Sequence, residues 1–298
     1  MTLDNFYISR RPALRPLSAL LLGLVLLAAT PFAQAGDRLL ATGGVMQLEG
    51  NGGGGLTPWA LIAGLGTDHQ IGATSACTRI KPSDFTLDLC GIAVGFYNRF
   101  ELSFAQQRFD LGTTVPGETI SQRIVGLKVR VLGDAVYDQD RWWPQVSVGL
   151  QYKKNQDFGF VPQLIGARDD HSIDWYANAT KVWLAGPFSR TFLANLTLRA
   201  TKANQLGILG FGGDRNDSYR IEPEVSLAAF LSDFVVAGVE YRKKPDNLSA
   251  FKEDDFKDLF VAWIPTKYLS VTGAFVDLGN IADKDNQRGW YLSLQGSF

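Results

Sequence analysis

The last ten residues of the chain, 289–298, alternate apolar and polar side chains. Successive side chains of an extended strand point to opposite faces, so this pattern predicts a β-strand with one apolar and one polar face. The apolar face comprises Trp290, Leu292, Leu294, Gly296 and Phe298, and the polar face Tyr291, Ser293, Gln295 and Ser297. Such a strand needs water on one side and an apolar environment on the other.

The same alternation recurs far from the C-terminus. It is present in segments 125–131, 145–152, 192–201 and 220–229. Repeated strands with one lipid-compatible face and one water-compatible face are typical of transmembrane β-barrels. A soluble β-sandwich contains similar single strands, so this alternative stays open from the pattern alone.

The N-terminal 35 residues predict an export signal. Arg10, Arg11 and Arg15 precede an apolar run over residues 19–29, and the small residues Ala33 and Ala35 follow at the −3 and −1 positions of a cleavage site. This order matches a secretory signal peptide cleaved near Ala35, which leaves one domain over residues 36–298. No later segment has the 18 consecutive apolar residues of a membrane helix. The chain is therefore either a soluble exported protein or an outer-membrane barrel.

We predict an all-β, antiparallel up-and-down barrel of about fourteen strands, with twelve as the alternative. The candidate strands are 39–49, 57–67, 70–80, 85–97, 100–111, 119–132, 143–154, 173–184, 191–202, 219–230, 234–243, 257–264, 268–277 and 289–298. Short connections alternate with longer polar ones, as expected for periplasmic turns and outer loops. Aromatic residues recur beside the short turns, which predicts a girdle at one membrane interface.

Two cysteines give a test of strand register. If loop 81–84 joins an antiparallel hairpin and residues 85 and 86 fray, Cys77 would lie directly opposite Cys90. In the oxidising periplasm this pair would form a structural disulfide. The alternative is two buried free thiols.

The terminal strand is similar to the C-terminal signal of Gram-negative outer-membrane barrels. The residues that carry this likeness are Trp290, Leu292, Leu294 and Phe298. It implies recognition by the barrel-assembly machinery, and contact with outer-membrane lipids and lipopolysaccharide. Segments 52–59, 134–142, 210–215, 243–248 and 288–294 further resemble an uncharacterised family of proteobacterial outer-membrane proteins, a domain of unknown function. That resemblance implies fold and location and supplies no catalytic residues.

Composition argues against several other functions. The net charge of −1 excludes a nucleic-acid binder driven by bulk positive charge. Two His and two Cys make a four-ligand zinc site improbable, so we expect no metal and no cofactor. We also expect no enzyme, because the two histidines, His69 and His171, fall in a turn and an outer loop.

The polar faces of the strands predict the lining of the lumen. The candidates for a charged constriction are Lys128, Arg130, Arg199, Arg220, Glu222, Glu224, Glu240 and Arg242. A turn centred near residue 232 would place Glu222 opposite Arg242 and Glu224 opposite Glu240. We therefore expect a narrow channel or transporter for a small polar or ionic solute, although charges that only tie the wall together would look the same.

Two other functions stay open. The barrel could be a structural or loop-display protein without transport, or an uptake barrel with an apolar pocket. The glycine-rich segment 43–58 fits either an outer hairpin turn or an N-terminal plug.

Overall fold

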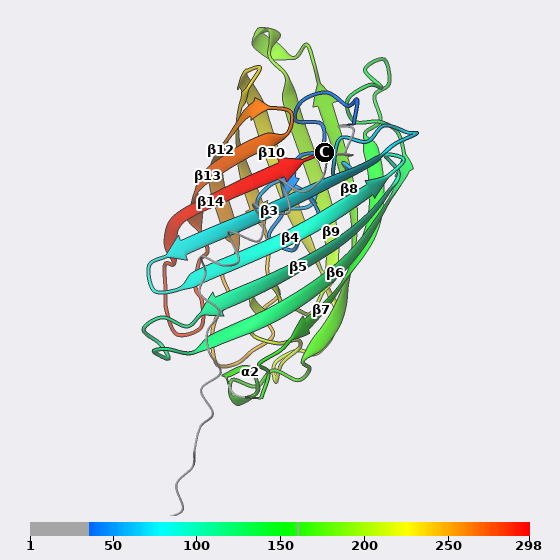
Figure 1. Cartoon of the computed structure of the whole chain (residues 1–298). Coiled ribbons are helices and arrows are strands. Elements are labelled where there is room, and N and C mark those ends of the chain that lie inside the picture. The colour runs from blue at the N-terminus through cyan, green and yellow to red at the C-terminus, as the bar shows by residue number, and fades with distance from the viewer. Residues whose placement is uncertain (1–35, 160) are drawn as a thin grey trace, which may run out of the picture. The chain divides into compact units, whose positions relative to one another are not determined.

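Twelve antiparallel strands form one closed barrel in the computed structural model, which describes residues 36–298 apart from residue 160 (Figure 1). Every strand pairs with its neighbours in the sequence, and the last strand pairs with the first to close the ring. The predicted signal peptide lies outside the described residues. Among the helices of the described part, none has the length and apolar character to cross a membrane.

The wall strands follow the predicted segments closely. They are β3 (Ile71–Pro82), β4 (Thr86–Phe96), β5 (Phe100–Asp110), β6 (Thr119–Leu132), β7 (Gln145–Asn155), β8 (His171–Trp183), β9 (Phe192–Thr201), β10 (Arg220–Ser232), β11 (Val235–Arg242), β12 (Phe256–Thr266), β13 (Leu269–Asp277) and β14 (Arg288–Ser297). The all-β barrel is thus confirmed with the alternative number of twelve strands.

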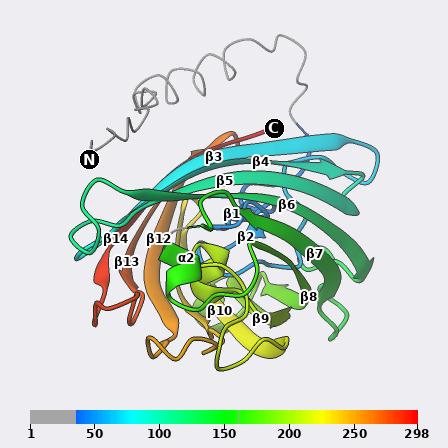
Figure 2. The same ribbon diagram turned by 90° about the horizontal axis from the view of Figure 1, so that it is seen from below.

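The prediction of fourteen strands was wrong because two glycine-rich segments do not join the wall. Within the predicted strands 39–49 and 57–67, the structure has only the short β1 (Val45–Met46), which pairs with β2 (Gly52–Gly53). These two strands lie inside the ring formed by the other twelve (Figure 2). Every residue from 45 to 66 is buried, so this segment has no face to offer to lipid.

The outer surface of the barrel is apolar around its middle. Large apolar side chains about half exposed come from strands on all sides, among them Leu102, Leu127, Leu196, Val239 and Leu292. A continuous exposed belt of this kind is typical of strands that face lipid.

Aromatic residues mark the end of the barrel that carries the shorter turns, which we call the inner end. Exposed rings there include Tyr97, Trp183, Phe234, Trp263 and Tyr268. Amphipathic rings favour the depth of lipid headgroups, so their position suits a membrane interface. The opposite end, with the longer loops, is called the outer end below.

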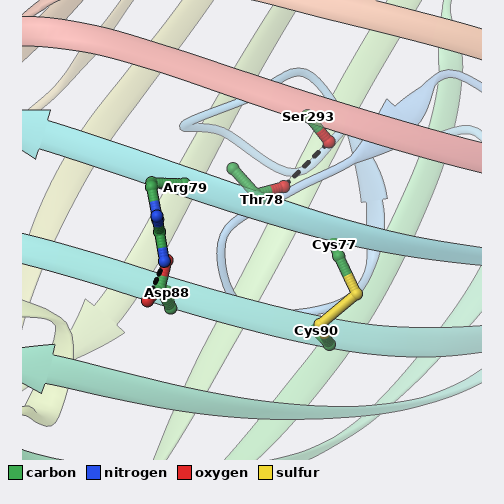
Figure 3. Close-up of a disulfide and its surroundings, with 6 residues drawn as sticks. All are labelled: Cys77, Thr78, Arg79, Asp88, Cys90 and Ser293. Atoms are coloured by element: carbon green, nitrogen blue, oxygen red, sulfur yellow. Dashed lines mark hydrogen bonds and ion pairs between the residues drawn. A yellow bond between two sulfur atoms is a disulfide. The ribbon is translucent and has the colours of Figure 1, made fainter. Parts of the chain in front are cut away.

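Strand β3 shows how successive side chains serve different faces (Figure 3). Cys77 forms a disulfide with Cys90 on β4, directly opposite, with a Cα–Cα distance of 4.2 Å. Thr78 points inward and donates a hydrogen bond of 2.8 Å to Ser293 on β14. Strand β3 thereby links to both of its neighbours through side chains.

The predicted register between β10 and β11 was wrong by two residues, since Glu224 was expected opposite Glu240. Glu224 lies opposite Arg242, and Glu240 lies opposite Ser226. The cause is the position of the turn, because Ser232 pairs with Val235 and the turn is therefore centred beyond residue 232. A β-bulge between Phe230 and Ser232 places an extra residue on β10 and moves the register back by one residue, toward the predicted pairing.

Candidate functional site in the barrel lumen

An inner plug, defined here as residues 45–66, fills the lumen from the inner end. All of its residues are buried, yet only a few belong to regular structure. Buried backbone N–H and C=O groups need hydrogen-bond partners, and a segment without a sheet must find them elsewhere. Some partners lie within the plug, such as the carbonyl of Gly55 for the N–H of Leu48, and many others are side chains on the inward face of the wall.

The clearest example is a buried ion pair, Lys128 on β6 and Glu101 on β5. The ammonium of Lys128 lies 2.9 Å from a Glu101 carboxylate oxygen, and it donates to the carbonyls of Gly52 at 2.9 Å and Leu61 at 2.8 Å. Glu101 accepts the N–H groups of Gly52 and Ala63. The two charged side chains therefore bind two separate stretches of the plug backbone.

Glu240 on β11 holds the middle of the plug. Its carboxylate accepts the N–H of Leu56 at 2.6 Å and the hydroxyl of Thr57 at 2.8 Å. Ser226 on β10 contacts the Thr57 hydroxyl and also donates to Glu240 at 2.7 Å. Other wall side chains that bond to the plug backbone are Thr74, Gln107, Gln145, Ser147, Thr180, Thr197 and Gln295.

Glu49, the single charged residue of the inner plug, enters a buried group of charges that we call the ion network. The other members lie on five adjacent strands, β7 to β11: they are Lys153, Asp174, Arg199, Glu224 and Arg242. Arg242 donates to both Glu49 oxygens, at 2.9 and 3.0 Å. Lys153 also contacts Glu49. The plug thus adds one carboxylate to a charged strip of wall.

Contacts among the wall residues complete the ion network. Lys153 lies 2.6 Å from Asp174, and Arg199 lies 2.5 Å from Glu224. Arg242 reaches Glu224 at 3.3 Å. The six side chains carry three positive and three negative formal charges. Such a balance is what a buried set of charges requires, because an unpaired charge in a low-dielectric interior is very costly.

A second pair of carboxylates lacks this balance. Asp258 on β12 lies opposite Glu240, and both are buried. Neither oxygen of Asp258 has a hydrogen-bond partner within the described residues, and the same holds for the hydroxyl of Tyr291 nearby. The groups converge on Gly55, whose missing Cβ would lie 3.6 Å from an Asp258 oxygen. No group of three metal-binding side chains occurs in the described part of the chain.

An outer cap, defined here as residues 203–213, enters the barrel from the opposite end. All of its residues are buried, including the 3₁₀ turn η2 (Asn204–Gly207). Asn155 on β7 donates to the carbonyl of Ile208 at 2.6 Å, and Gln205 donates to Glu253 at 2.6 Å. The cap is therefore bound in the same way as the plug, by side chains from the wall and a neighbouring loop.

The plug and the cap meet in one apolar cluster. Leu48 and Leu56 of the plug, with Leu206 and Ile208 of the cap, belong to this cluster. Its wall members are Ile80, Leu87, Leu89, Phe109, Ile120, Phe256, Val276 and Tyr291. An apolar layer thus adjoins the charged middle of the lumen, and the pattern of the sequence did not predict this layer.

Five of the predicted lumen residues lie at the plug or in the ion network: Lys128, Arg199, Glu224, Glu240 and Arg242. The other three lie elsewhere. Arg130 pairs with Asp68 and Asp134 at the inner rim. Glu222 lies 3.4 Å from Lys243, and Arg220 is exposed at the start of β10.

Sequence reasoning missed Glu49, Glu101, Lys153, Asp174 and Asp258. For the wall residues a signal was available, because Lys153 continues the inward set that Gln145 and Gln151 begin. For Glu49 the signal was its isolation, as the lone charge in a glycine-rich apolar stretch.

His171 and Ser172, which are neighbours in the sequence, do not face each other as a catalytic Ser–His pair would. His171 and Ser172 are consecutive residues of β8, so they lie on opposite faces of the wall. His171 is exposed and bonds to Asp170, whereas Ser172 is buried and contacts the hydroxyl of Tyr219.

Most segments that carry the family resemblance lie in, or contact, the inner plug and the outer cap. Segment 52–59 lies in the inner plug, and 210–213 ends the outer cap. Asn247, in segment 243–248, donates to Asn204 of the cap at 3.0 Å. In segment 134–142, Ala135 and Val136 pack in one apolar cluster with Trp59 of the plug.

Three solved barrels show a distant likeness to this chain. The KdgM porin has a TM-score of 0.46 at 11% identity, covering 76% of this chain and 99% of its own. The outer membrane protein Omp33 of Acinetobacter baumannii has 0.40 at 8%, covering 77% and 97%. Outer membrane phospholipase A from Escherichia coli has 0.39 at 9%, covering 76% and 91%. None of these TM-scores reaches 0.5, so the likeness carries no information on function.

Sequence comparison identifies the family. No curated protein matches the chain in sequence. The model of the DUF3034 family, described as a protein of unknown function, matches residues 42–295. This match confirms the resemblance found in the sequence, and the chain belongs to the DUF3034 family.

Proposed function

We propose that the protein is an outer-membrane channel for a small polar or ionic solute, closed in this state by the inner plug. The apolar belt and the aromatic rings at the inner end support the location in a membrane. In this proposal outer-membrane lipids and lipopolysaccharide surround the belt, and β14 carries the signal for the barrel-assembly machinery.

The observation that carries the proposal is the way the plug is held. Apolar plug side chains such as Trp59 pack against the wall, but the plug is also held by many hydrogen bonds and ion pairs, such as Lys128 with Gly52 and Arg242 with Glu49. Buried ion pairs add little stability compared with apolar packing of the same volume. Their advantage is that water can solvate every one of these groups once the plug leaves. If the plug only filled the barrel permanently, an apolar contact between plug and wall would make the protein more stable.

A reversible tether between plug and wall tests the proposal. The hydroxyls of Thr57 and Ser226 are in contact, so Thr57→Cys/Ser226→Cys should allow a disulfide between plug and β10. Both substitutions are made with Cys77→Ser/Cys90→Ser, so that the native disulfide does not interfere. Conductance is then measured in planar bilayers, before and after addition of a reductant.

We expect transient conductance from the single-cysteine controls, none from the oxidised double variant, and recovery on reduction. Heat-modifiable gel mobility would show that each variant is a folded barrel. Folded controls that never conduct would contradict the channel, and would favour a structural or loop-display barrel.

One observation favours a second candidate, the uptake of an apolar compound. The apolar cluster between plug and cap could receive such a ligand if the cap moved. The matched test is binding of an apolar fluorescent probe to the wild type and to Leu206→Arg. Saturable binding that the variant loses would support uptake, and equal binding by both would oppose it.

A further inference from the structure

We propose that Lys153, Arg199 and Arg242 form a binding site for the carboxylate of small polar organic acids, which Glu49 occupies in the closed state. This inference rests on the proposed channel and assigns its solute class. In this view the plug carries an internal substitute for the solute, and an organic acid that reaches the site competes with Glu49.

The contacts of Glu49 are those of a bound carboxylate ligand. Two nitrogens of Arg242 lie 2.9 and 3.0 Å from its two oxygens, and Lys153 contacts it from β7. The planar guanidinium fork matches a carboxylate through two parallel hydrogen bonds, which makes Arg the preferred group for such recognition. The cations all belong to the wall, so the site stays in place when the plug moves.

The charge of the ion network requires an anion at this position. Without Glu49, the three cations would face only Asp174 and Glu224, which leaves one positive charge in excess. All five wall side chains are almost completely buried. A carboxylate of the solute restores the neutrality that Glu49 provides in the closed state.

Arg199 supplies a donor that Glu49 does not fully use. Its Nη2 lies 3.3 Å from a Glu49 oxygen but makes no hydrogen bond within the described residues, although the side chain is 1% exposed. The chain restricts how Glu49 can lie, because its own N–H is bonded to the Gln47 side chain. A free carboxylate has no such restriction and can satisfy both Arg242 and Arg199.

Polar neighbours extend the site beyond the carboxylate. Asn51 of the plug accepts a hydrogen bond from Gln151 at 2.5 Å and donates one to the hydroxyl of Tyr176 at 2.9 Å. Both partners lie on the wall, and Gln151 also accepts from Arg199. Departure of Asn51 would free them for a hydroxyl or amide of the solute, which favours a polar acid over a fatty acid.

The test compares succinate with its neutral analogue succinamide at constant ionic strength. The open probability of the wild type in planar bilayers is measured with each compound, and the reversal potential in a KCl gradient reports ion selectivity. The variants are Glu49→Gln, Arg242→Gln, Arg242→Lys and the double variant Glu49→Gln/Arg242→Gln. Arg79→Gln, on the outward face beside the disulfide, is the matched control.

We expect succinate, and not succinamide, to raise the open probability of the wild type about tenfold, the factor given by one charge-assisted hydrogen bond. Arg79→Gln should keep this response. Arg242→Gln should lose it, and Arg242→Lys, which keeps the charge without the fork, should retain only part. Glu49→Gln should open more often than the wild type and prefer anions, and the double variant should lose that preference.

Failures of the two proposals are distinguishable. A Glu49→Gln channel that conducts without anion preference, with no effect of succinate on the wild type, would overturn the carboxylate site and leave the channel standing. Folded variants that never conduct, including the untethered single-cysteine controls, would overturn both. Heat-modifiable mobility identifies any variant that fails to fold, and Lys153→Gln, predicted to weaken the succinate response, then replaces it.

Discussion

Glu49 and Arg242 join the plug to the wall across 193 positions of sequence. Glu49 lies between the two short strands of the plug, and Arg242 is the last residue of β11. Because both side chains are almost completely buried, removal of either charge leaves the ion network with one uncompensated charge. A single substitution at Glu49 or Arg242 should therefore weaken the closure of the lumen.

A double-mutant cycle on this pair should show strong coupling. Glu49→Gln and Arg242→Gln each leave one uncompensated charge in the buried ion network, so each should lower the free energy of unfolding by about 3–5 kcal/mol. The double variant should lose clearly less than the sum, because both members of the pair are then neutral. Urea unfolding in lipid vesicles measures the three values.

The exposed pair Arg79–Asp88 is the control for that cycle, since about half of each side chain is accessible. Arg79→Gln and Asp88→Asn should couple by about 1 kcal/mol or less. If the losses of unfolding free energy for Glu49→Gln and Arg242→Gln were additive, as expected for the control pair, the buried contact would not hold the plug.

Lipid contact can be tested at two depths of one strand. Leu227 and Leu231 lie on the outward face of β10 and are about half exposed, Leu227 in mid-strand and Leu231 beside the inner turn. Leu227→Arg should destabilise the folded barrel by about 2–4 kcal/mol, and Leu231→Arg by about 0–1 kcal/mol. Unfolding midpoints in lipid vesicles give both numbers. Equal, small effects at the two positions would contradict a membrane location for this belt.

Local alternation made the wall predictable. In a strand that faces lipid on one side and the lumen on the other, the polarity of each side chain indicates its face. On β7, for example, the apolar Val148 points outward and the polar Gln151 points inward. The alternation therefore placed β3 to β14 within a few residues. It also assigned the inward face, which includes Arg199 and Glu224.

The plug could not be predicted in the same way. Its residues are buried on all sides, so no periodicity distinguishes the contacts of Glu49 from those of Leu48 or Leu56. Its structure depends on partners about 50 to 250 positions away, among them Glu101 and Gln295. The pairing of Glu240 failed for another reason, because Ser232 pairs with Val235 and the alternation along a strand does not fix where the following turn is centred.

The disulfide should contribute to stability and not to transport. Cys77 and Cys90 close a loop with a sequence separation of 13, and they lie on the outward face of the wall. Cys77→Ser/Cys90→Ser should lower the free energy of unfolding by up to about 3 kcal/mol, because the unfolded chain regains the freedom of that loop. Urea unfolding with and without a reductant measures the effect.

The double-serine variant is its own control for that experiment. The reductant should destabilise the wild type and leave the variant unchanged, and the conductance of both should be equal. A change in conductance on reduction would instead connect the disulfide to the lumen.

An acid-sensitive contact holds the outer loops together. Asp214, directly after the outer cap, bonds through its carboxylate to the hydroxyl and the N–H of Ser249 in the next outer loop. These hydrogen bonds stabilise the ionised form, so the pKa of Asp214 lies below its ordinary value. A lowered acid pKa means that the contact stabilises the fold fully above the ordinary Asp value of about 3.9 and is lost as the pH falls through the lower folded value.

Amide hydrogen exchange at Ser249 measures this contact. Protection should be constant from neutral pH down to about pH 5 and should fall below about pH 4, after correction for the intrinsic exchange rate. Asp214→Asn keeps the size of the side chain and removes the charge, so its protection should be lower at neutral pH and independent of pH over that range. If the wild type showed the same flat profile as the variant, the carboxylate of Asp214 would not be the group that secures the loop. The two outer loops would then be held by their other contacts, which are the backbone bonds from Arg215 and Asn216 to Asn247 and the side-chain contact of Arg215 with Asp246.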